Sequence, residues 1–453
     1  MHDPAPDARP VVMTVAGSDS GGGAGIQADL KTAEAGGAFA ASAVTAVTAQ
    51  HTRGVESTHV LPVEEIAAQI EAVRDDFVVD GLKTGMLATE PVIELAAEHA
   101  ADLGPPAVVD PVMVAASGDR LLDPEAEAAY ETLLGEATLA TPNADEAEVL
   151  TGVTVEDHES AAEAGRALLE TGVDAALVKG GHVAGSPVRD VLVTANGVET
   201  FEHPRVDTDA THGSGCTLAS AIAARLAGGD DLTMAVEAGT DLLARAVRYH
   251  HDIGEGPGAV HHLVELRERA ARDSTREAVE SVVRRFVEGN VSRVVPEVGM
   301  NVVGATPYAE RLGETAAVEG RITRTLTGVA PNRGVRFGAS SHVARFLLAA
   351  RERDPNLQFA VNCRFDDGIE RALAELAAPA VEIDRDTEPD PDEEGTTMGW
   401  AAHRAFERAD GTPVAVYDRG DVGKEAVTRV LDEDAGTAAE RVLALAERAG
   451  GGQ

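Results

Sequence analysis

The stretch 209–219 reads Asp-Ala-Thr-His-Gly-Ser-Gly-Cys-Thr-Leu-Ala, a loop of small residues that leads directly into an apolar helix. The first turn of a helix carries unpaired backbone N–H groups and the positive end of the helix dipole, so it is a typical anion-binding site. A cysteine at this position, Cys216, is biased toward the thiolate and can accept a proton. A phosphate-binding loop beside a candidate base predicts phosphoryl transfer to an alcohol. The alternative is a glycine-rich helix start with a buried, unreactive cysteine.

Composition and charge limit what this protein can bind. The 453-residue chain is long enough for two or three domains, and it carries 77 acidic against 38 basic residues, a formal net charge of −39. This charge disfavours nucleic acid and anionic membranes as partners. The lysines are Lys31, Lys83, Lys179 and Lys424, and aromatic residues make up 3% of the chain. An acidic excess with so few lysines is typical of a salt-adapted cytoplasmic protein, and it makes each lysine a candidate for a functional role.

The sequence shows no pattern typical of export or of membrane insertion. Residues 1–10 lack a charged segment followed by an apolar one, and no run approaches the ~18 apolar residues of a membrane span. The two cysteines, Cys216 and Cys363, have no paired spacing that would predict a disulfide framework or a zinc site. We therefore expect a soluble cytoplasmic protein.

Residues 11–264 alternate short apolar runs with amphipathic helices. Strands are predicted at 11–16, 107–109, 139–141 and 175–178, a hairpin at 188–201 that turns at Asn196-Gly197, and helices at about 62–77, 125–134, 160–171, 215–227 and 231–250. This alternation predicts an α/β fold with a mostly parallel sheet covered by helices on both faces. Ligands of such sheets gather at the carboxyl ends of the strands.

The chain is predicted to contain a second α/β domain at 278–450, after a densely charged linker at 265–277 and with a disordered N-terminus at 1–10. The second domain opens with an amphipathic helix near 278. Its further elements are strands at about 293–303, 316–327, 357–364, 380–384 and 413–417, and helices at 341–352, 368–377, 396–408 and 436–448.

The first strand runs into another loop of small residues, Ala16-Gly-Ser-Asp-Ser-Gly-Gly-Gly-Ala-Gly-Ile-Gln-Ala-Asp-Leu-Lys-Thr32. Its glycines let the backbone approach a ligand closely, but the loop is neither a Walker A loop nor a clean dinucleotide fingerprint. Together with 209–219, it resembles the signature of hydroxymethylpyrimidine and phosphomethylpyrimidine kinases of the ribokinase-like superfamily. Further stretches that match this family, in order and at its spacing, are 45–50, 83–87, 109–113, 141–146, 178–182 and 211–217.

The resemblance implies a site for an aminopyrimidine alcohol. Gln50 would hydrogen-bond the aminopyrimidine, and Met86 would lie against its ring. Residues of the first loop would line the same pocket, namely Gly17, Asp19 and Gly25. Cys216 would be the catalytic base, and the transferring phosphoryl charge would be held by the backbone N–H groups of Gly213, Ser214 and Gly215.

The resemblance also implies ATP and Mg²⁺. Lys179 would contact an ATP phosphate, with Asn143 and Thr211 in the same ATP site. Asp110 and Glu146 would supply the oxygen ligands that a hard cation prefers. Members of this family phosphorylate the alcohol and then the resulting monophosphate.

Several of these residues also have a purely structural interpretation. Asn143 and Glu146, which follow Pro142, fit a helix cap closed by its fourth-position glutamate. The other structural alternatives are a turn for Asp110, a strand-end amide for Gln50, packing or ion pairing for Lys83, and loop hydrogen bonds for His182 and His212.

In the second domain, arginines gather within 25 residues of this acidic chain: Arg321, Arg324, Arg333, Arg336 and Arg345. Clustered arginines suit bidentate recognition of phosphate, although ion pairs with the many carboxylates are the alternative. Ser340 or Ser341 could cap the helix that carries His342 and so form another anion site.

These segments resemble the archaeal-type thiamine-phosphate synthase domain. The resemblance implies Arg321 and His342 as the catalytic pair, and the residues implied in substrate binding are Asn301, Arg324 and Arg336, with Asn332 and Arg333 as weaker candidates. Such a domain joins the pyrimidine diphosphate to a thiazole phosphate and releases pyrophosphate.

The two resemblances predict a bifunctional enzyme of thiamine biosynthesis whose partners are an aminopyrimidine, its phosphate and a thiazole phosphate, and relatives suggest a homodimer. One alternative is a kinase whose C-terminal domain senses a ligand, against which the retained Arg321 and His342 argue. The other is a different vitamin kinase, such as a pyridoxal kinase, against which Gln50 and Cys216 argue.

Overall fold

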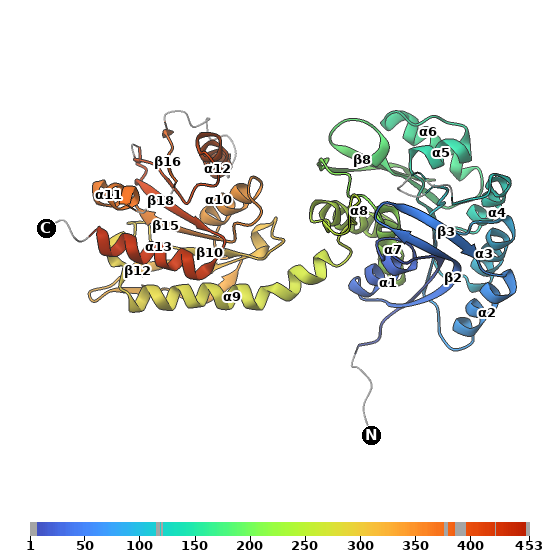
Figure 1. Ribbon diagram of the computed structural model, residues 1–453, viewed down its shortest axis with the longest axis horizontal. Coiled ribbons are helices and arrows are strands. Elements are labelled where there is room, and N and C mark those ends of the chain that lie inside the picture. The colour runs from blue at the N-terminus through green and yellow to red at the C-terminus, as the bar shows by residue number, and fades with distance from the viewer. Residues whose placement is uncertain are drawn as a thin grey trace, which may run out of the picture. The chain divides into compact units, whose positions relative to one another are not determined.

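The computed structural model describes residues 7–114, 118, 121–375, 379–385, 396–421 and 423–449 (Figure 1). It divides into two compact units, Met1–Glu265 and Leu266–Gln453. Residues 1–6 of the N-terminus that the sequence predicts to be disordered lie outside the described residues. No helix in the described part of the chain is long and apolar enough to cross a membrane.

The first unit is built on a nine-stranded sheet with the order β3-β2-β1-β4-β5-β6-β7-β8-β9. Its strands are β1 (Val11–Asp19), β2 (Phe39–His51), β3 (Gly54–Val60), β4 (Gly81–Thr84), β5 (Ala107–Val109), β6 (Leu139–Ala140), β7 (Ala175–Val178), β8 (Val188–Thr194) and β9 (Gly197–His203). The ladder from β2 to β7 is parallel, whereas β3, β8 and β9 pair antiparallel at the two edges. The predicted mostly parallel sheet is therefore confirmed.

Helices cover both faces of this sheet, as predicted (Figure 1). They are α1 (Gly25–Ala35), α2 (Val63–Arg74), α3 (Glu90–Leu103), α4 (Tyr130–Gly135), α5 (Ala144–Thr151), α6 (His158–Leu169), α7 (Ser214–Ala227) and α8 (Leu232–Arg248), with short 3₁₀ segments η1 (Pro124–Ala129) and η2 (Gly180–His182). Successive residues of a strand face opposite sides, so Met13 of β1 packs with the core under α2 and α3, whereas Val12 packs with α7 and α8. The helix predicted at 125–134 is divided between η1 and α4.

The second unit has a mostly antiparallel sheet with the order β14-β11-β10-β15-β18-β17-β16, in which β16 and β17 pair in parallel. The strands are β10 (Val302–Ala305), β11 (Thr315–Val318), β14 (Val335–Phe337), β15 (Phe359–Arg364), β16 (Ala380–Glu382), β17 (Ala415–Tyr417) and β18 (Val427–Asp432), with a separate ribbon of β12 (Ile322–Arg324) and β13 (Val329–Pro331). The helices are α9 (Val264–Glu288), α10 (His342–Arg351), α11 (Asp367–Glu375), α12 (Thr396–Arg408) and α13 (Ala435–Arg448), and the 3₁₀ segments are η3 (Val291–Val294) and η4 (Leu312–Glu314).

The charged segment 265–277, predicted as a helical or flexible linker, is helical, because it is part of the continuous helix α9, and its Glu268 is buried where Thr306 donates a hydrogen bond to it. Two predicted strands of the second unit differ in the structure. The strand predicted at 293–303 is the 3₁₀ segment η3 followed by β10. The strand predicted at 316–327 breaks at Gly320 and Arg321, which both adopt positive φ angles, 78° and 71°.

Candidate functional site

A cavity of about 600 Å³ lies at the carboxyl end of the first sheet, just beyond the ends of β1, β5 and β7. The chain folds so that loops far apart in sequence meet there, because parallel strands end at the same edge. The kinase candidates from the sequence all line this cavity: Gly17, Asp19, Gly25, Gln50, Met86, Asp110, Asn143, Glu146, Lys179, Thr211, Gly213, Ser214, Gly215 and Cys216.

The amino-terminal turn of α7 faces the cavity. Gly213 precedes the helix with φ of 83°, and a Cβ there would lie 1.8 Å from the carbonyl oxygen of Gly23, so only glycine fits. The N–H of Ser214 donates to Thr211 O at 3.0 Å, and no acceptor for the N–H of Gly215 or Cys216 lies within the described residues. Of the three predicted donors, only the Ser214 N–H has an acceptor within the described residues, so the N–H groups of Gly213 and Gly215, and that of Cys216 beside them, stay candidates for binding an anion.

Gly215 lies where several charged groups converge. A Cβ on Gly215 would lie 3.2 Å from Oδ2 of Asp110 and 3.3 Å from Nζ of Lys179. Because Gly215 has no side chain, the lysine and the carboxylate can approach the end of the helix closely. This geometry suits a phosphate group accompanied by a cation.

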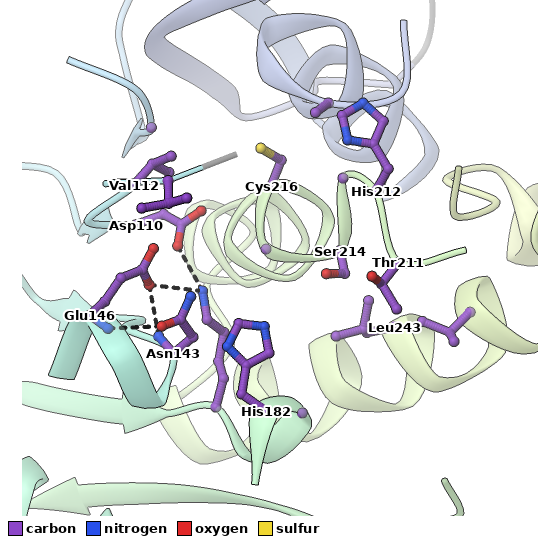
Figure 2. Close-up of a pocket in the computed structure, with 18 of the residues that line it drawn as sticks. Asp110, Val112, Asn143, Glu146, His182, Thr211, His212, Ser214, Cys216 and Leu243 are labelled. Atoms are coloured by element: carbon purple, nitrogen blue, oxygen red, sulfur yellow. Dashed lines mark hydrogen bonds and ion pairs between the residues drawn. The ribbon is translucent and has the colours of Figure 1, made fainter. Parts of the chain in front are cut away.

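Cys216 projects from the same turn into the cavity (Figure 2). Its side chain is half-buried, and burial raises the pKa of the thiol to about 11, although the ammonium of Lys83 and the backbone N–H of Gly25 act in the opposite direction. The expectation that the helix end biases Cys216 toward the thiolate is therefore corrected, because burial outweighs the groups that favour the charged form. Such a thiol is a weak acid, so its thiolate, once formed, would be a strong base.

Asp110, Lys179 and Glu146 form a buried charged group beside the turn. Nζ of Lys179 lies 2.9 Å from Oδ1 of Asp110 and 3.8 Å from Oε2 of Glu146. Burial raises the pKa of Glu146 to about 7, although Lys179 opposes the shift. The capping box predicted as an alternative is present, because Asn143 Oδ1 accepts from the N–H of Glu146 and Glu146 Oε2 accepts from the N–H of Asn143.

The donor set of this group fits Mg²⁺ held partly by a substrate. Asp110 and Glu146 are both buried, and no cluster of three or more His, Cys, Asp or Glu side chains able to hold a metal occurs within the described residues. Mg²⁺ is commonly bound by one or two carboxylates, with water and substrate phosphates completing its ligands. The two carboxylates beside the end of α7 match that pattern.

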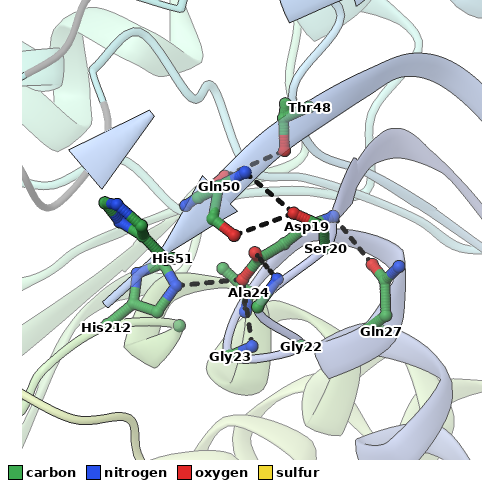
Figure 3. Close-up of polar contacts among 12 residues, drawn as sticks. Asp19, Ser20, Gly22, Gly23, Ala24, Gln27, Thr48, Gln50, His51 and His212 are labelled. Atoms are coloured by element: carbon green, nitrogen blue, oxygen red, sulfur yellow. Dashed lines mark hydrogen bonds and ion pairs between the residues drawn. The ribbon is translucent and has the colours of Figure 1, made fainter. Parts of the chain in front are cut away.

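Asp19 holds the glycine loop in shape (Figure 3). Its carboxylate accepts hydrogen bonds from the N–H groups of Gly21, Gly23 and Ala24 and lies 3.0 Å from Nε2 of His212. Burial alone would raise the pKa of Asp19, but His212 and these backbone donors outweigh it and lower the pKa. Asp19 thus lines the cavity through the loop that it braces, and His212 is the loop hydrogen-bonder that the sequence offered as an alternative.

The side chains of Met86 and Gln50 line another part of the cavity. Sδ of Met86 lies 3.0 Å from where a Cβ on Gly17 would be, so Met86 packs against the backbone of the first loop. Gln50 Oε1 accepts from the hydroxyl of Thr48 at 3.2 Å, and the Gln50 backbone is held by Ser20 (Figure 3). A Cβ on Gly25 would lie 2.4 Å from Gly17 O, which explains the glycine there sterically.

Two parts of the cavity wall were not identified from the sequence. The first is apolar and consists of Val149, Leu243, Ala244 and Val247. Leu243 and Val247 are one helical turn apart, a spacing that ordinarily indicates a core-facing helix surface. The second is Arg205, which donates to the carbonyl oxygens of Gly181, Val183 and Gly185 and so ties down the loop after Lys179.

In the second unit, Arg321 has an unusual backbone. Its φ of 71° is left-handed, which is rare for a side chain of this size, and its guanidinium donates to Val298 O. Gly299 packs beneath it, since a Cβ there would lie 3.2 Å from Cβ and Cδ of Arg321. His342 is the first residue of α10, and its Nδ1 lies 3.2 Å from Ser341 Oγ.

The remaining candidates of the second unit have local partners. Arg324 donates to Val295 O, and the exposed Arg333 and Arg336 both pair with Glu319. Asn301 is buried, and its amide donates to Val318 O and accepts from Val318 N–H. Both ends of that amide therefore join β11 to the residue before β10, which gives Asn301 a structural role, and its contact with a substrate stays a prediction.

A mostly parallel sheet with an anion-binding helix end and a paired lysine at its carboxyl edge defines an α/β phosphotransferase. Residues 19–261 match the family model of phosphomethylpyrimidine kinase, and residues 278–444 match that of the thiamine-phosphate synthase ThiN. The chain belongs to the phosphomethylpyrimidine kinase family and carries a thiamine-phosphate synthase domain behind it.

Relatives and solved structures agree with this assignment. The hydroxymethylpyrimidine/phosphomethylpyrimidine kinase of Streptomyces coelicolor is 48% identical over 258 residues, which are 57% of this chain and 96% of the relative. The thiamine biosynthesis bifunctional protein ThiED of Geobacter sulfurreducens is 45% identical over 57% of this chain and 54% of its own length. The pyridoxal kinase of Bacillus subtilis, solved as an ADP complex, has a TM-score of 0.53 at 32% identity and covers 56% of this chain and 98% of its own. A Staphylococcus aureus pyridoxal kinase, solved with AMP-PCP and pyridoxal, has a TM-score of 0.54 at 30% identity, covering 58% and 96%.

Proposed function

We propose that the first unit transfers phosphoryl groups from ATP to 4-amino-5-hydroxymethyl-2-methylpyrimidine and then to its monophosphate. The second unit couples the resulting diphosphate with 4-methyl-5-(2-phosphoethyl)thiazole, giving thiamine phosphate and pyrophosphate. One observation carries the proposed kinase activity of the first unit. A helix amino terminus, Lys179 and Asp110 converge at Gly215, beside the thiol of Cys216.

In the first transfer, the thiolate of Cys216 accepts the proton of the hydroxymethyl group. The alkoxide oxygen then attacks the γ-phosphorus of ATP, the bond to the bridging oxygen breaks, and ADP leaves. The N–H groups of Gly213, Gly215 and Cys216, which have no acceptor within the described residues, would stabilise the charge that develops on the transferring group, and Lys179 would neutralise phosphate oxygens. Mg²⁺, when bound at Asp110 and Glu146, would neutralise further phosphate charge.

The pyrimidine is proposed to lie between Gln50 and Met86. The amide of Gln50 can both donate and accept, which matches the amino group and ring nitrogen of an aminopyrimidine. ATP is proposed to contact Asn143 and Thr211, and the apolar wall of Leu243 and Val247 in the same cavity would offer a surface for the adenine ring.

In the second unit, Arg321 is proposed to bind the departing pyrophosphate, with His342 as a hydrogen-bond donor to it. A left-handed non-glycine residue is held at a cost in conformational energy, and such strain is concentrated at functional sites. Arg324 and Arg336 are secondary candidates for substrate phosphate, since each is already bonded to the protein itself.

We further propose a cytoplasmic, salt-adapted homodimer whose partners are small molecules rather than nucleic acid or membranes. The net charge of −39 supports the absence of nucleic-acid and membrane partners, because it repels phosphate backbones and anionic lipids. Light scattering tests the proposed homodimer, and kinase activity over a series of potassium chloride concentrations tests the proposed salt adaptation.

The decisive experiment supplies the purified full chain with Mg²⁺, ATP, the pyrimidine alcohol and the thiazole phosphate in potassium-rich buffer. Mass spectrometry is expected to find thiamine phosphate, and Arg321→Ala is expected to stop at the pyrimidine diphosphate. Diphosphate without thiamine phosphate in the unaltered chain would instead indicate a ligand-sensing second unit. Faster phosphorylation of pyridoxal than of the pyrimidine would indicate that the first unit is a pyridoxal kinase.

A further inference from the structure

Lys83, in β4, is a fully buried lysine directly below the cavity. Its side chain is 0% exposed, and its Nζ lies 2.8 and 2.9 Å from the two carboxylate oxygens of Asp29, which is itself buried. Asp29 also accepts hydrogen bonds from the hydroxyls of Thr14 at 2.6 Å and Ser220 at 2.8 Å. The Asp29 carboxylate is therefore saturated with donors from β1, β4 and α7.

Two observations place the ammonium of Lys83 next to the catalytic turn. Ser220 follows Cys216 by four residues on α7, so both side chains lie on the same face of that helix. A Cβ on Gly85, a residue of the cavity wall, would lie 2.9 Å from Nζ of Lys83. The positive charge therefore lies just beneath the cavity surface on the Cys216 side of α7.

The charged groups that act on Cys216 come from several elements. Lys83 on β4 and Lys179 after β7 are positive, whereas Asp29 on α1 and Asp110 after β5 are negative. Burial is the main influence on the Cys216 thiol and raises its pKa, and Lys83 is the strongest opposing influence. Lys179 is already paired with Asp110 and Glu146, and we expect it to pair with an ATP phosphate during the reaction. Lys179 therefore cannot stabilise the negative charge of the Cys216 thiolate throughout the reaction.

We propose that Lys83 is a positioning residue whose buried ammonium sustains the thiolate of Cys216, with Asp29 keeping that ammonium charged. Lys83 retains its proton during the transfer; the proton of the substrate hydroxyl goes to sulfur. Burial is the largest single influence on the Lys83 ammonium and lowers its pKa, but the negative charges of Asp29, Cys216 and Asp110 together outweigh burial and raise the pKa, so the charge persists over the working pH range. The inference rests on the proposed role of Cys216 as the base.

The test is the rate at which iodoacetamide alkylates Cys216 in the full chain, followed by mass spectrometry over a pH series. Only the thiolate reacts, so the rate reports how much thiolate is present. In Lys83→Met, which keeps the length of the side chain but not its charge, the rate at about pH 8 is expected to fall at least tenfold, equivalent to about one pKa unit. The buried Cys363 serves as an internal reference that should remain unmodified in folded protein.

Thr14→Val is the matched control, because it removes a hydrogen bond to the same carboxylate without changing any charge. Its alkylation rate should stay within about threefold of the unaltered chain. An equal loss of rate in both variants, or none in Lys83→Met, would overturn the proposal and leave Lys83 a purely structural ion pair.

Removing one partner of a buried ion pair can prevent folding, so a second variant is needed. The double change Lys83→Met with Asp29→Asn leaves no unpaired charge, and its alkylation rate should still fall below that of the unaltered chain because Lys83 outweighs Asp29 at the thiol. An unchanged rate there also overturns the proposal. A Cys216→Ala chain with full kinase activity would refute the proposed base without affecting the alkylation result, so the two failures are distinguishable.

Discussion

The Nζ atom of Lys179 lies 2.9 Å from Oδ1 of Asp110, and both groups face the first turn of α7 at Gly215. Each charge compensates the other in a site with little exposure to water. When ATP and a cation bind, the lysine can exchange its carboxylate for a phosphate while the carboxylate gains the cation. Binding therefore exchanges partners and buries no new uncompensated charge.

We expect Lys179→Met to lower the kcat of pyrimidine phosphorylation by about 10²–10³, because a preorganised positive charge on the transferring group is lost. Lys424→Met, at an exposed lysine of the second unit, is the control and should leave the rate unchanged. Steady-state kinetics of ADP release compare the two. A loss of less than about tenfold would remove Lys179 from the transfer step.

Glu146 predicts a pH dependence. Burial raises its pKa from 4.5 to about 7, so its contribution to stability is fully present below about pH 4.5 and is lost as the pH rises through about 7. Binding of Mg²⁺ and ATP needs the carboxylate and should therefore tighten over the same interval. Glu146→Gln is expected to flatten both profiles, measured by thermal unfolding of the free protein and by calorimetric titration with MgATP. Parallel profiles for both proteins would contradict this role.

Gly213 and Gly215 should respond differently to the same substitution. In Gly213→Ala the new Cβ would overlap Gly23 O at a φ of 83°, so unfolding should become easier by about 2–4 kcal/mol. In Gly215→Ala the Cβ meets only Asp110 and Lys179 at 3.2 and 3.3 Å, so the fold should persist while kinase activity falls. Denaturant unfolding and kinase assays on both variants check this contrast. Equal destabilisation by the two changes would contradict it.

The fold was predictable wherever a strand is a short apolar run or a helix is strongly amphipathic. The predictions for β5, β7 and α12 match the structure to the residue. The β2–β3 hairpin was not predicted, because β2 is built of alanine, serine and threonine with mixed burial. The apolar stretch at Val291 resembles a strand but forms 3₁₀ segment η3, since Asn290 before it is left-handed and its side chain caps the turn.

The candidate site was predictable where a motif places a functional group on a loop, and less so where partners are distant in sequence. The sequence marked Lys83 as scarce and able to form an ion pair, but Asp29 lies 54 residues away and could not be matched to it. The structural role of Asn301 was not predicted, because its partner is the backbone of Val318, which leaves no trace in the side-chain pattern. The loss of the Ser214 N–H to the carbonyl oxygen of Thr211 was likewise not predictable, because it depends on the backbone geometry of the loop.

Cys216 should matter more for the first phosphoryl transfer than for the second. The hydroxymethyl group must lose a proton, whereas the monophosphate already presents an anionic oxygen and needs no base. Cys216→Ala is therefore expected to lower the first rate by about 10²–10⁴ and the second by about tenfold or less. Separate assays started from the alcohol and from the monophosphate measure the two rates. Equal losses would indicate that Cys216 acts by shaping the site rather than by accepting a proton.

Arg321 allows stability and activity to be separated in the second unit. Its φ of 71° disfavours any residue with a Cβ by about 1–2 kcal/mol, whereas glycine adopts this conformation freely. Arg321→Gly should therefore unfold at a higher temperature than Arg321→Ala, since both lose the same guanidinium contacts but only glycine relieves the strain. Both variants should fail to make thiamine phosphate while still accumulating the pyrimidine diphosphate, as followed by calorimetry and mass spectrometry. Thiamine phosphate formed at the normal rate by Arg321→Gly would show that the left-handed turn, and not its charge, is what the second unit requires.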